Sequence, residues 1–128
     1  RRVHIVVVSY CWHTSKHPDP RGFSMRILST VIGARLTSEH MPVEDLAIFI
    51  DWCSLYQRPR TMEQERAFRA TLPTMHLWYA HSETNVWLLT DVPDGVTPYT
   101  NRGWPTFENC VASMITGGPN LLDLGKLK

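Results

Sequence analysis

The run Ile5-Val6-Val7-Val8 constrains the fold more than any other segment, because consecutive β-branched residues are stiff and pack best in an extended strand. Polar groups flank the run but none interrupts it, as they would in a strand with one face in water. Uninterrupted apolar strands are typical of parallel sheets that are covered on both faces. We therefore predict that residues 5–8 form a central strand of such a sheet.

Helical and extended patterns alternate along the rest of the chain. Apolar side chains recur at helical spacing in three segments, which are residues 24–36, 61–79 and 105–115. Short apolar runs predict two further buried strands, at residues 46–50 and 85–89. Residues 10–22 and 91–101 are expected to be loops, and no element is predicted for residues 120–128. Because strands and helices alternate, we expect a flavodoxin-like three-layer sandwich of the α/β class with a central parallel sheet.

The second helical segment carries its own start and stop signals. Thr61 and Gln64 have the spacing of a capping box, which predicts the first turn of a helix. Pro73 interrupts the apolar face of this helix, and proline removes a backbone donor and crowds the preceding turn. We therefore expect the helix to kink or restart near Leu72.

Length and composition indicate one ordinary globular domain over residues 1–128, with 43% hydrophobic and 20% charged residues. No apolar run approaches the roughly 20 residues that span a bilayer, so no membrane partner is expected. The net charge of +1 provides no strong attraction to nucleic acid. The chain begins Arg1-Arg2-Val3, without a secretory signal or an initiator Met, which favours a cytoplasmic domain cut from a longer chain.

The cysteines do not suggest a disulfide framework or a metal site. Cys11, Cys53 and Cys110 are odd in number and lack paired spacing, which is typical of free thiols in a reducing compartment. Zinc takes four ligands of the kind that Cys11, Cys53, His13 and His17 supply, but their spacing matches no zinc motif. We expect no metal there. No glycine-rich phosphate loop is present, so hydrolysis of ATP or GTP is not expected.

Glu108 is the leading candidate for chemistry. It follows Pro105 by three residues, which places it in the first turn of a predicted helix, where the helix dipole favours an ionised carboxylate. A fixed anion stabilises the positive charge that develops on a ribose when its leaving group departs. A helix-start residue with no chemical role would occupy the same position, so both interpretations remain open at this point.

Four further residues fall where α/β sheets bind ligands, beyond the carboxyl ends of the strands. Tyr10 and Trp12 begin the first loop and are suited to stack on nicotinamide or adenine, although Tyr10 is equally suited to the core. Asp51 ends the second strand, where a carboxylate bonds either the next turn's N–H groups or a ribose hydroxyl. Trp104 is expected mainly to pack and to position Glu108.

Three segments resemble Toll/interleukin-1 receptor (TIR) domains. Arg102-Gly103-Trp104-Pro105-Thr106-Phe107-Glu108 resembles the family's Trp-x-x-x-Glu segment, and Val8-Ser9-Tyr10 resembles the end of its first strand. Phe49-Ile50-Asp51 with Leu55 resembles its second strand and the following loop. The segments follow in the family's order over roughly residues 4–115. The run from Phe49 to Gln57, together with Arg102-Gly103-Trp104, also resembles a divergent branch in proteins of unicellular eukaryotes. Cys11 differs, since many TIR domains have Arg directly after the Ser-Tyr pair.

The resemblance implies an enzyme, an NAD+ nucleosidase that cleaves the bond between nicotinamide and ribose with Glu108 as its catalytic residue. NAD is then the substrate, no separate cofactor is expected, and the family's habit implies self-association of identical domains. The candidate substrate-binding residues are Ser9, Tyr10, Trp12, Asp51 and Trp104. Two alternatives remain: a non-enzymatic signalling adaptor that acts by self-association, and a nucleoside-processing transferase of the same fold.

Overall fold

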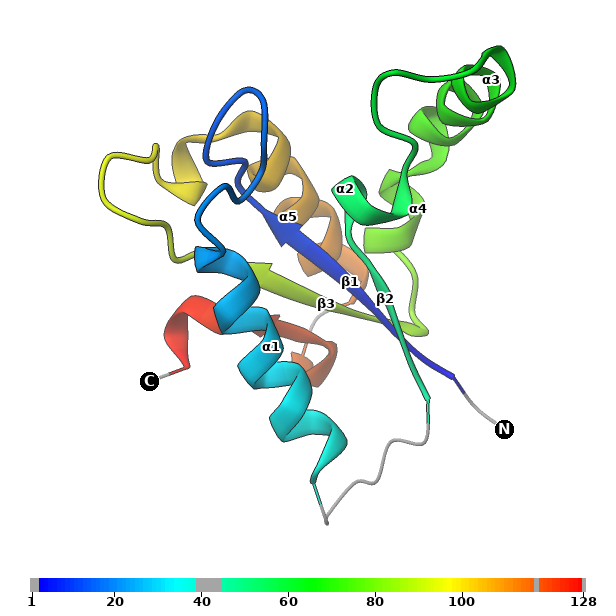
Figure 1. Cartoon of the computed structure of the whole chain (residues 1–128). Helices are drawn as coiled ribbons and strands as arrows, with labels where there is room; N and C mark the ends of the chain where they lie inside the picture. The colour runs from blue at the N-terminus through cyan, green and yellow to red at the C-terminus, as the bar shows by residue number, and fades with distance from the viewer. Residues whose placement is uncertain (1–2, 39–44, 117, 128) are drawn as a thin grey trace.

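A four-stranded sheet forms the centre of the computed structural model, which describes residues 3–38, 45–116 and 118–127 (Figure 1). All neighbouring strands run parallel, in the order β2-β1-β3-β4. The strands are β1 (His4–Tyr10), β2 (Leu46–Phe49), β3 (Thr84–Leu89) and β4 (Leu121–Asp123). The fold is therefore the predicted α/β fold with flavodoxin-like topology.

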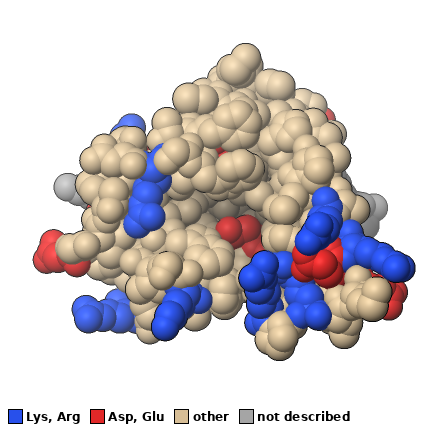
Figure 2. Space-filling model, turned by 90° about the horizontal axis from the view of Figure 1, so that it is seen from above, with Lys and Arg blue, Asp and Glu red and all other residues tan. Residues whose placement is uncertain are grey.

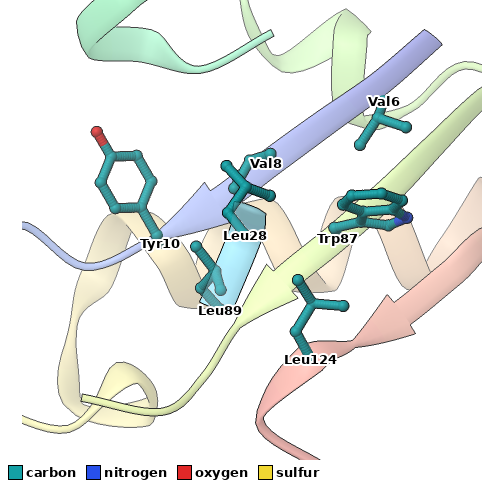
Figure 3. Close-up of a cluster of buried hydrophobic side chains, with 7 residues drawn as sticks. All are labelled: Val6, Val8, Tyr10, Leu28, Trp87, Leu89 and Leu124. Atoms are coloured by element: carbon teal, nitrogen blue, oxygen red, sulfur yellow. The ribbon is translucent and has the colours of Figure 1, made fainter. Parts of the chain in front are cut away.

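Successive side chains of β1 point to opposite faces of the sheet, and each face is covered by helices. Val6 and Val8 pack against Leu28 of α1 (Phe23–Leu36), in the cluster that Figure 3 shows. On the other face Val7 packs with side chains from α4 (His76–Tyr79) and α5 (Gly103–Ile115), which are Tyr79 and Ala112. This two-sided burial explains why the strand carries an uninterrupted apolar run.

The element boundaries differ from the sequence predictions at several points. β1 continues through Ser9 to Tyr10, so Tyr10 ends a strand instead of opening a loop. α5 begins at Gly103, two residues before the expected start at Pro105. β2 lies at the edge of the sheet and is only half-buried, whereas we expected a fully buried strand. β4 was not predicted at all, and it pairs with β3.

The second helical segment restarts where proline was expected to interrupt it. Thr61 and Gln64 form both bonds of the capping box at the start of α3 (Met62–Thr71). A 3-10 turn, η1 (Leu72–Thr74), contains Pro73 and leads into α4. α3 has no buried residue and extends away from the sheet in Figure 1.

The carboxyl ends of the strands carry the connections that build the site. β1 leads into the first loop, β2 leads into the short helix α2 (Asp51–Ser54), and a 3-10 turn, η2 (Tyr99–Asn101), leads into α5. In parallel α/β sheets this edge is where ligands bind. None of the helices in the described ranges is long and apolar enough to cross a membrane.

Candidate active site

A cavity of about 350 Å³ opens at the carboxyl edge of the sheet, between β1, α2 and the start of α5. Five of the six sequence-predicted site residues line it, which are Tyr10, Trp12, Asp51, Trp104 and Glu108. Figure 2, which looks down on the molecule from above, shows a hollow near the middle of this face with an acidic side chain at its margin. The fold thus gathers residues that are up to 98 positions apart in the sequence.

Glu108 is buried, with only 3% of its surface exposed. Because α5 begins at Gly103, Glu108 lies in the second helical turn and its side chain points toward the sheet. The expectation of a first-turn carboxylate, held ionised by the helix dipole, is therefore wrong, since the dipole acts mainly within the first turn. Burial decides the protonation state of this residue instead.

Burial raises the pKa of Glu108 from 4.5 to about 7, because a desolvated carboxylate is disfavoured. Hydrogen bonds from Ser9, Tyr79 and Trp104 act in the opposite direction, and the negative charge of Asp51 raises the pKa further. A carboxyl group with this pKa exchanges its proton near neutral pH. That is the range in which a carboxyl group serves either as an acid or as an anion.

A chain of three hydroxyl contacts ties Glu108 to the neighbouring loop. The Oγ atom of Ser9 lies 2.5 Å from Glu108 Oε2 and 2.6 Å from the hydroxyl of Tyr99. The Tyr99 hydroxyl in turn lies 2.9 Å from the carbonyl oxygen of Pro105. The two hydroxyls supply only two protons for these three contacts. The Ser9 proton is directed to Glu108 Oε2, and this hydrogen bond favours the ionised carboxylate, in opposition to burial.

Ser9 therefore plays a different part from the substrate contact expected for it. Its exposed fraction is 0%, it does not line the cavity, and its hydroxyl is occupied by Glu108 and Tyr99. Ser9 acts on the site through Glu108. Tyr99 was missed by the sequence analysis, because it lies in a loop whose only signals were prolines and a glycine.

Asp51 holds the opposite wall of the cavity together. Its Oδ1 atom accepts hydrogen bonds from the Tyr10 hydroxyl at 2.8 Å and from the Trp52 backbone N–H at 2.6 Å. Its Oδ2 atom accepts one from the Trp12 indole N–H at 3.0 Å. The backbone-bonding alternative for Asp51 is thus confirmed, and about one of its four acceptor sites remains for a ligand.

The two tryptophans of the cavity differ in their packing. Trp12 is partly buried against the core beside β1, and its ring meets Trp52 edge-on at 5.1 Å between ring centroids. Trp12 therefore has core contacts as well as a place on the cavity wall. Trp104 is 49% exposed and lies 5.6 Å from Phe107, so it borders the cavity instead of packing in the core.

Arg102 and Cys11 also line the cavity, although neither was predicted as a site residue. The Nη2 atom of Arg102 donates to the backbone oxygen of Trp12 at 3.2 Å. Cys11 is buried, and this burial raises the pKa of its thiol despite the nearby Arg102 charge. A protonated thiol is a poor nucleophile, so we interpret Cys11 as a lining residue of the cavity and not as a nucleophile.

The histidines and cysteines tested for zinc do not form a metal centre in the described part of the chain, where no three potential ligands converge. His13 lies 3.4 Å from Asp19 and contacts Ser24 at 3.1 Å, while His17 accepts the backbone N–H of Asp19. These contacts organise the first loop. Cys11, Cys53 and Cys110 are all free.

Comparison with models of known families, with curated proteins and with solved structures gave no match. The chemistry of the cavity is therefore argued from its own residues.

Proposed function

We propose that this chain is a TIR-like NAD+ nucleosidase, in which Glu108 assists cleavage of the bond between nicotinamide and ribose. The observation that supports the proposal most is the position of Glu108, a buried carboxyl group with a pKa near neutrality at the floor of an open cavity. Burying an ionisable carboxyl group lowers the stability of the fold, and such groups cluster at functional sites. Two indole rings at the same cavity suit a substrate with aromatic ends.

The proposed reaction breaks the bond between ribose C1′ and the nicotinamide nitrogen, and the electron pair leaves with the neutral nicotinamide. Positive charge then develops on the ribose, and the ionised Glu108 stabilises it. Water adds to C1′ and gives up a proton, so the products are ADP-ribose, nicotinamide and one proton. Attack by the adenine ring in place of water gives a cyclic ADP-ribose.

Substrate binding prepares Glu108 for this role. The nicotinamide ring of NAD is positively charged, and a nearby positive charge favours the ionised form of a carboxyl group. Ser9 stabilises the ionised form as well, because its hydroxyl can donate directly to Glu108 Oε2. Near neutral pH both forms of Glu108 are present, and the cationic substrate shifts the balance toward the anion.

The test is to incubate the purified protein with NAD and to measure free nicotinamide by chromatography. We expect release that depends on the protein and is abolished in Glu108→Gln, which keeps the size of the side chain but cannot ionise. The matched control is Glu63→Gln on the exposed helix α3, which should release nicotinamide at the parent rate.

Absence of release at every protein concentration and pH tested would overturn the proposal. In that case self-association measured by sedimentation would favour the adaptor. Cleavage of nucleosides in place of NAD would favour the nucleoside-processing transferase.

A further inference from the structure

Arg102 brings positive charge to the cavity. Among the described residues that line it, Arg102 is the only cation, and it faces a cavity that also holds Asp51 and Glu108. No carboxylate in the described part of the chain forms an ion pair with Arg102. Within residues 3–38, 45–116 and 118–127, no carboxylate therefore neutralises the charge of Arg102.

The side chain of Arg102 also keeps a buried donor without a partner. Its Nη2 atom bonds the Trp12 carbonyl oxygen, but its Nε atom is buried and makes no hydrogen bond. A guanidinium group has five N–H donors in a rigid planar arrangement. Buried donors are rarely left unpaired in native proteins, so this one points to a ligand.

The backbone beside Arg102 offers further donors to the same ligand. Arg102 is the N-cap residue of α5, and its side chain makes no capping bond. The N–H groups of Gly103 and Trp104 have no acceptor among the described residues, because the first helical bond is that from Thr106 to Arg102. The start of a helix with free N–H groups favours an anion.

We propose that Arg102 and the first turn of α5 bind a phosphate group of the substrate, so that the site takes nucleotides in preference to nucleosides. Arginine binds phosphate through two parallel hydrogen bonds, which its Nε and a terminal nitrogen can supply together. This inference rests on the proposed function only for the identity of the ligand, because NAD carries two phosphates next to its ribose groups. Arg102 is then the residue that separates the NAD enzyme from the nucleoside-processing alternative.

The test compares two ligands that differ only in one phosphate, nicotinamide mononucleotide and nicotinamide riboside. Their dissociation constants are measured by calorimetry in the Glu108→Gln background, where turnover cannot consume them. We expect the mononucleotide to bind at least tenfold more tightly, since hydrogen bonds between charged groups are the strong ones. In Arg102→Met the difference between the two ligands should disappear, and Arg102→Lys should keep part of it.

Two controls make the result decisive. Arg66→Met removes an exposed arginine on α3, outside the cavity, and should leave both dissociation constants unchanged. AMP and adenosine form a second pair that differs by one phosphate but has no nicotinamide. If AMP is preferred through Arg102 while neither nicotinamide ligand binds, the phosphate site stands and the proposed function fails.

Three results would overturn the assignment of Arg102. Equal affinity of each phosphorylated ligand and its unphosphorylated partner would do so. A phosphate preference that survives undiminished in a folded Arg102→Met protein would do so as well. Absence of binding by all four ligands up to millimolar concentration would overturn both the phosphate site and the proposed function.

Discussion

At the scale of single residues, Glu108 links the stability of the fold to the chemistry of the site. In the unfolded chain its pKa returns to about 4.5, whereas in the folded chain it is about 7. Between these values the unfolded chain loses its proton and the folded chain keeps it. The free energy of unfolding should therefore fall as the pH rises from 4.5 to 7 and level off above that. A pKa difference of this size corresponds to about 3 kcal/mol.

The first prediction concerns Glu108→Gln, which is neutral at every pH and keeps the volume of the side chain. We expect the variant and the parent to unfold with similar free energies near pH 4, and the variant to be more stable by up to about 3 kcal/mol at pH 8. Urea unfolding at several pH values measures the difference. A gap that stays constant with pH, or one equally present in the exposed control Glu63→Gln, would contradict this role of burial.

The second prediction uses the proton count of the Ser9, Tyr99 and Glu108 network. Ser9 Oγ donates to Glu108 Oε2, and the Tyr99 hydroxyl is a second acceptor within reach of the same Ser9 proton. Tyr99→Phe removes that acceptor, so it should lower the pKa of Glu108. Ser9→Ala removes the donor that stabilises the ionised carboxylate, so it should raise the pKa.

Carbon-13 NMR of the Glu108 carboxyl group measures both shifts directly, and the pH profile of kcat/KM for NAD should move with them. Because the ionised form is the active one under the proposed function, kcat/KM should rise with pH through the pKa of the free enzyme. Shifts of the same sign in Tyr99→Phe and Ser9→Ala would show that the hydroxyls only pack around Glu108.

At the scale of elements, the sequence predicted best those segments whose pattern is local. The run at residues 5–8, the capping box at Thr61 and the interruption at Pro73 each need only neighbouring residues to form, and all three were confirmed. β4 escaped prediction because a strand of three residues has no measurable periodicity. It exists because it pairs with β3, which is a contact between distant segments.

The third prediction tests how β4 is held against β3. Gly125 follows β4, and a Cβ atom there would collide with Thr90 Oγ1 and meet the backbone nitrogen of Asp91 at 3.0 Å. Gly125→Ala must therefore push the end of β4 away from β3. We expect a loss of about 1 to 3 kcal/mol in the free energy of unfolding, as for other overpacked positions.

Gly33→Ala is the matched control for Gly125→Ala, since Gly33 lies inside α1 and a Cβ atom there meets nothing within 4 Å. Alanine in an exposed helix interior should raise the free energy of unfolding by about 0.5 to 1 kcal/mol. Denaturant unfolding of both variants gives the comparison. Equal effects of the two substitutions would mean that the end of β4 is not closely packed on β3.

At the scale of the whole molecule, the sequence predicted most of the residues that meet at the cavity, but not what each of them does there. Five candidate residues meet at one cavity because parallel strands present their carboxyl ends at one edge. The burial of Glu108, the indirect position of Ser9 and the orphan donor of Arg102 depend on how α5 packs against β1. Such packing involves residues about 100 positions apart, for which one sequence without relatives carries no signal.

The last prediction concerns assembly, which the TIR resemblance implies. Trp104 and Phe107 lie one turn apart on α5 beside the cavity and are 49% and 46% exposed, so a second copy that covers them would also close the cavity to water. A closed cavity strengthens the electrostatic effect of Glu108 on the developing ribose charge. We therefore expect nicotinamide release per molecule to fall when the protein is diluted from high micromolar to nanomolar concentration.

Phe107→Ser should shift this fall to higher concentration, whereas Met114→Ser, at the other end of α5 and 83% exposed, should not. Sedimentation at the same concentrations should show dissociation in parallel. Constant activity per molecule across the range would show that one copy of the chain is a complete enzyme.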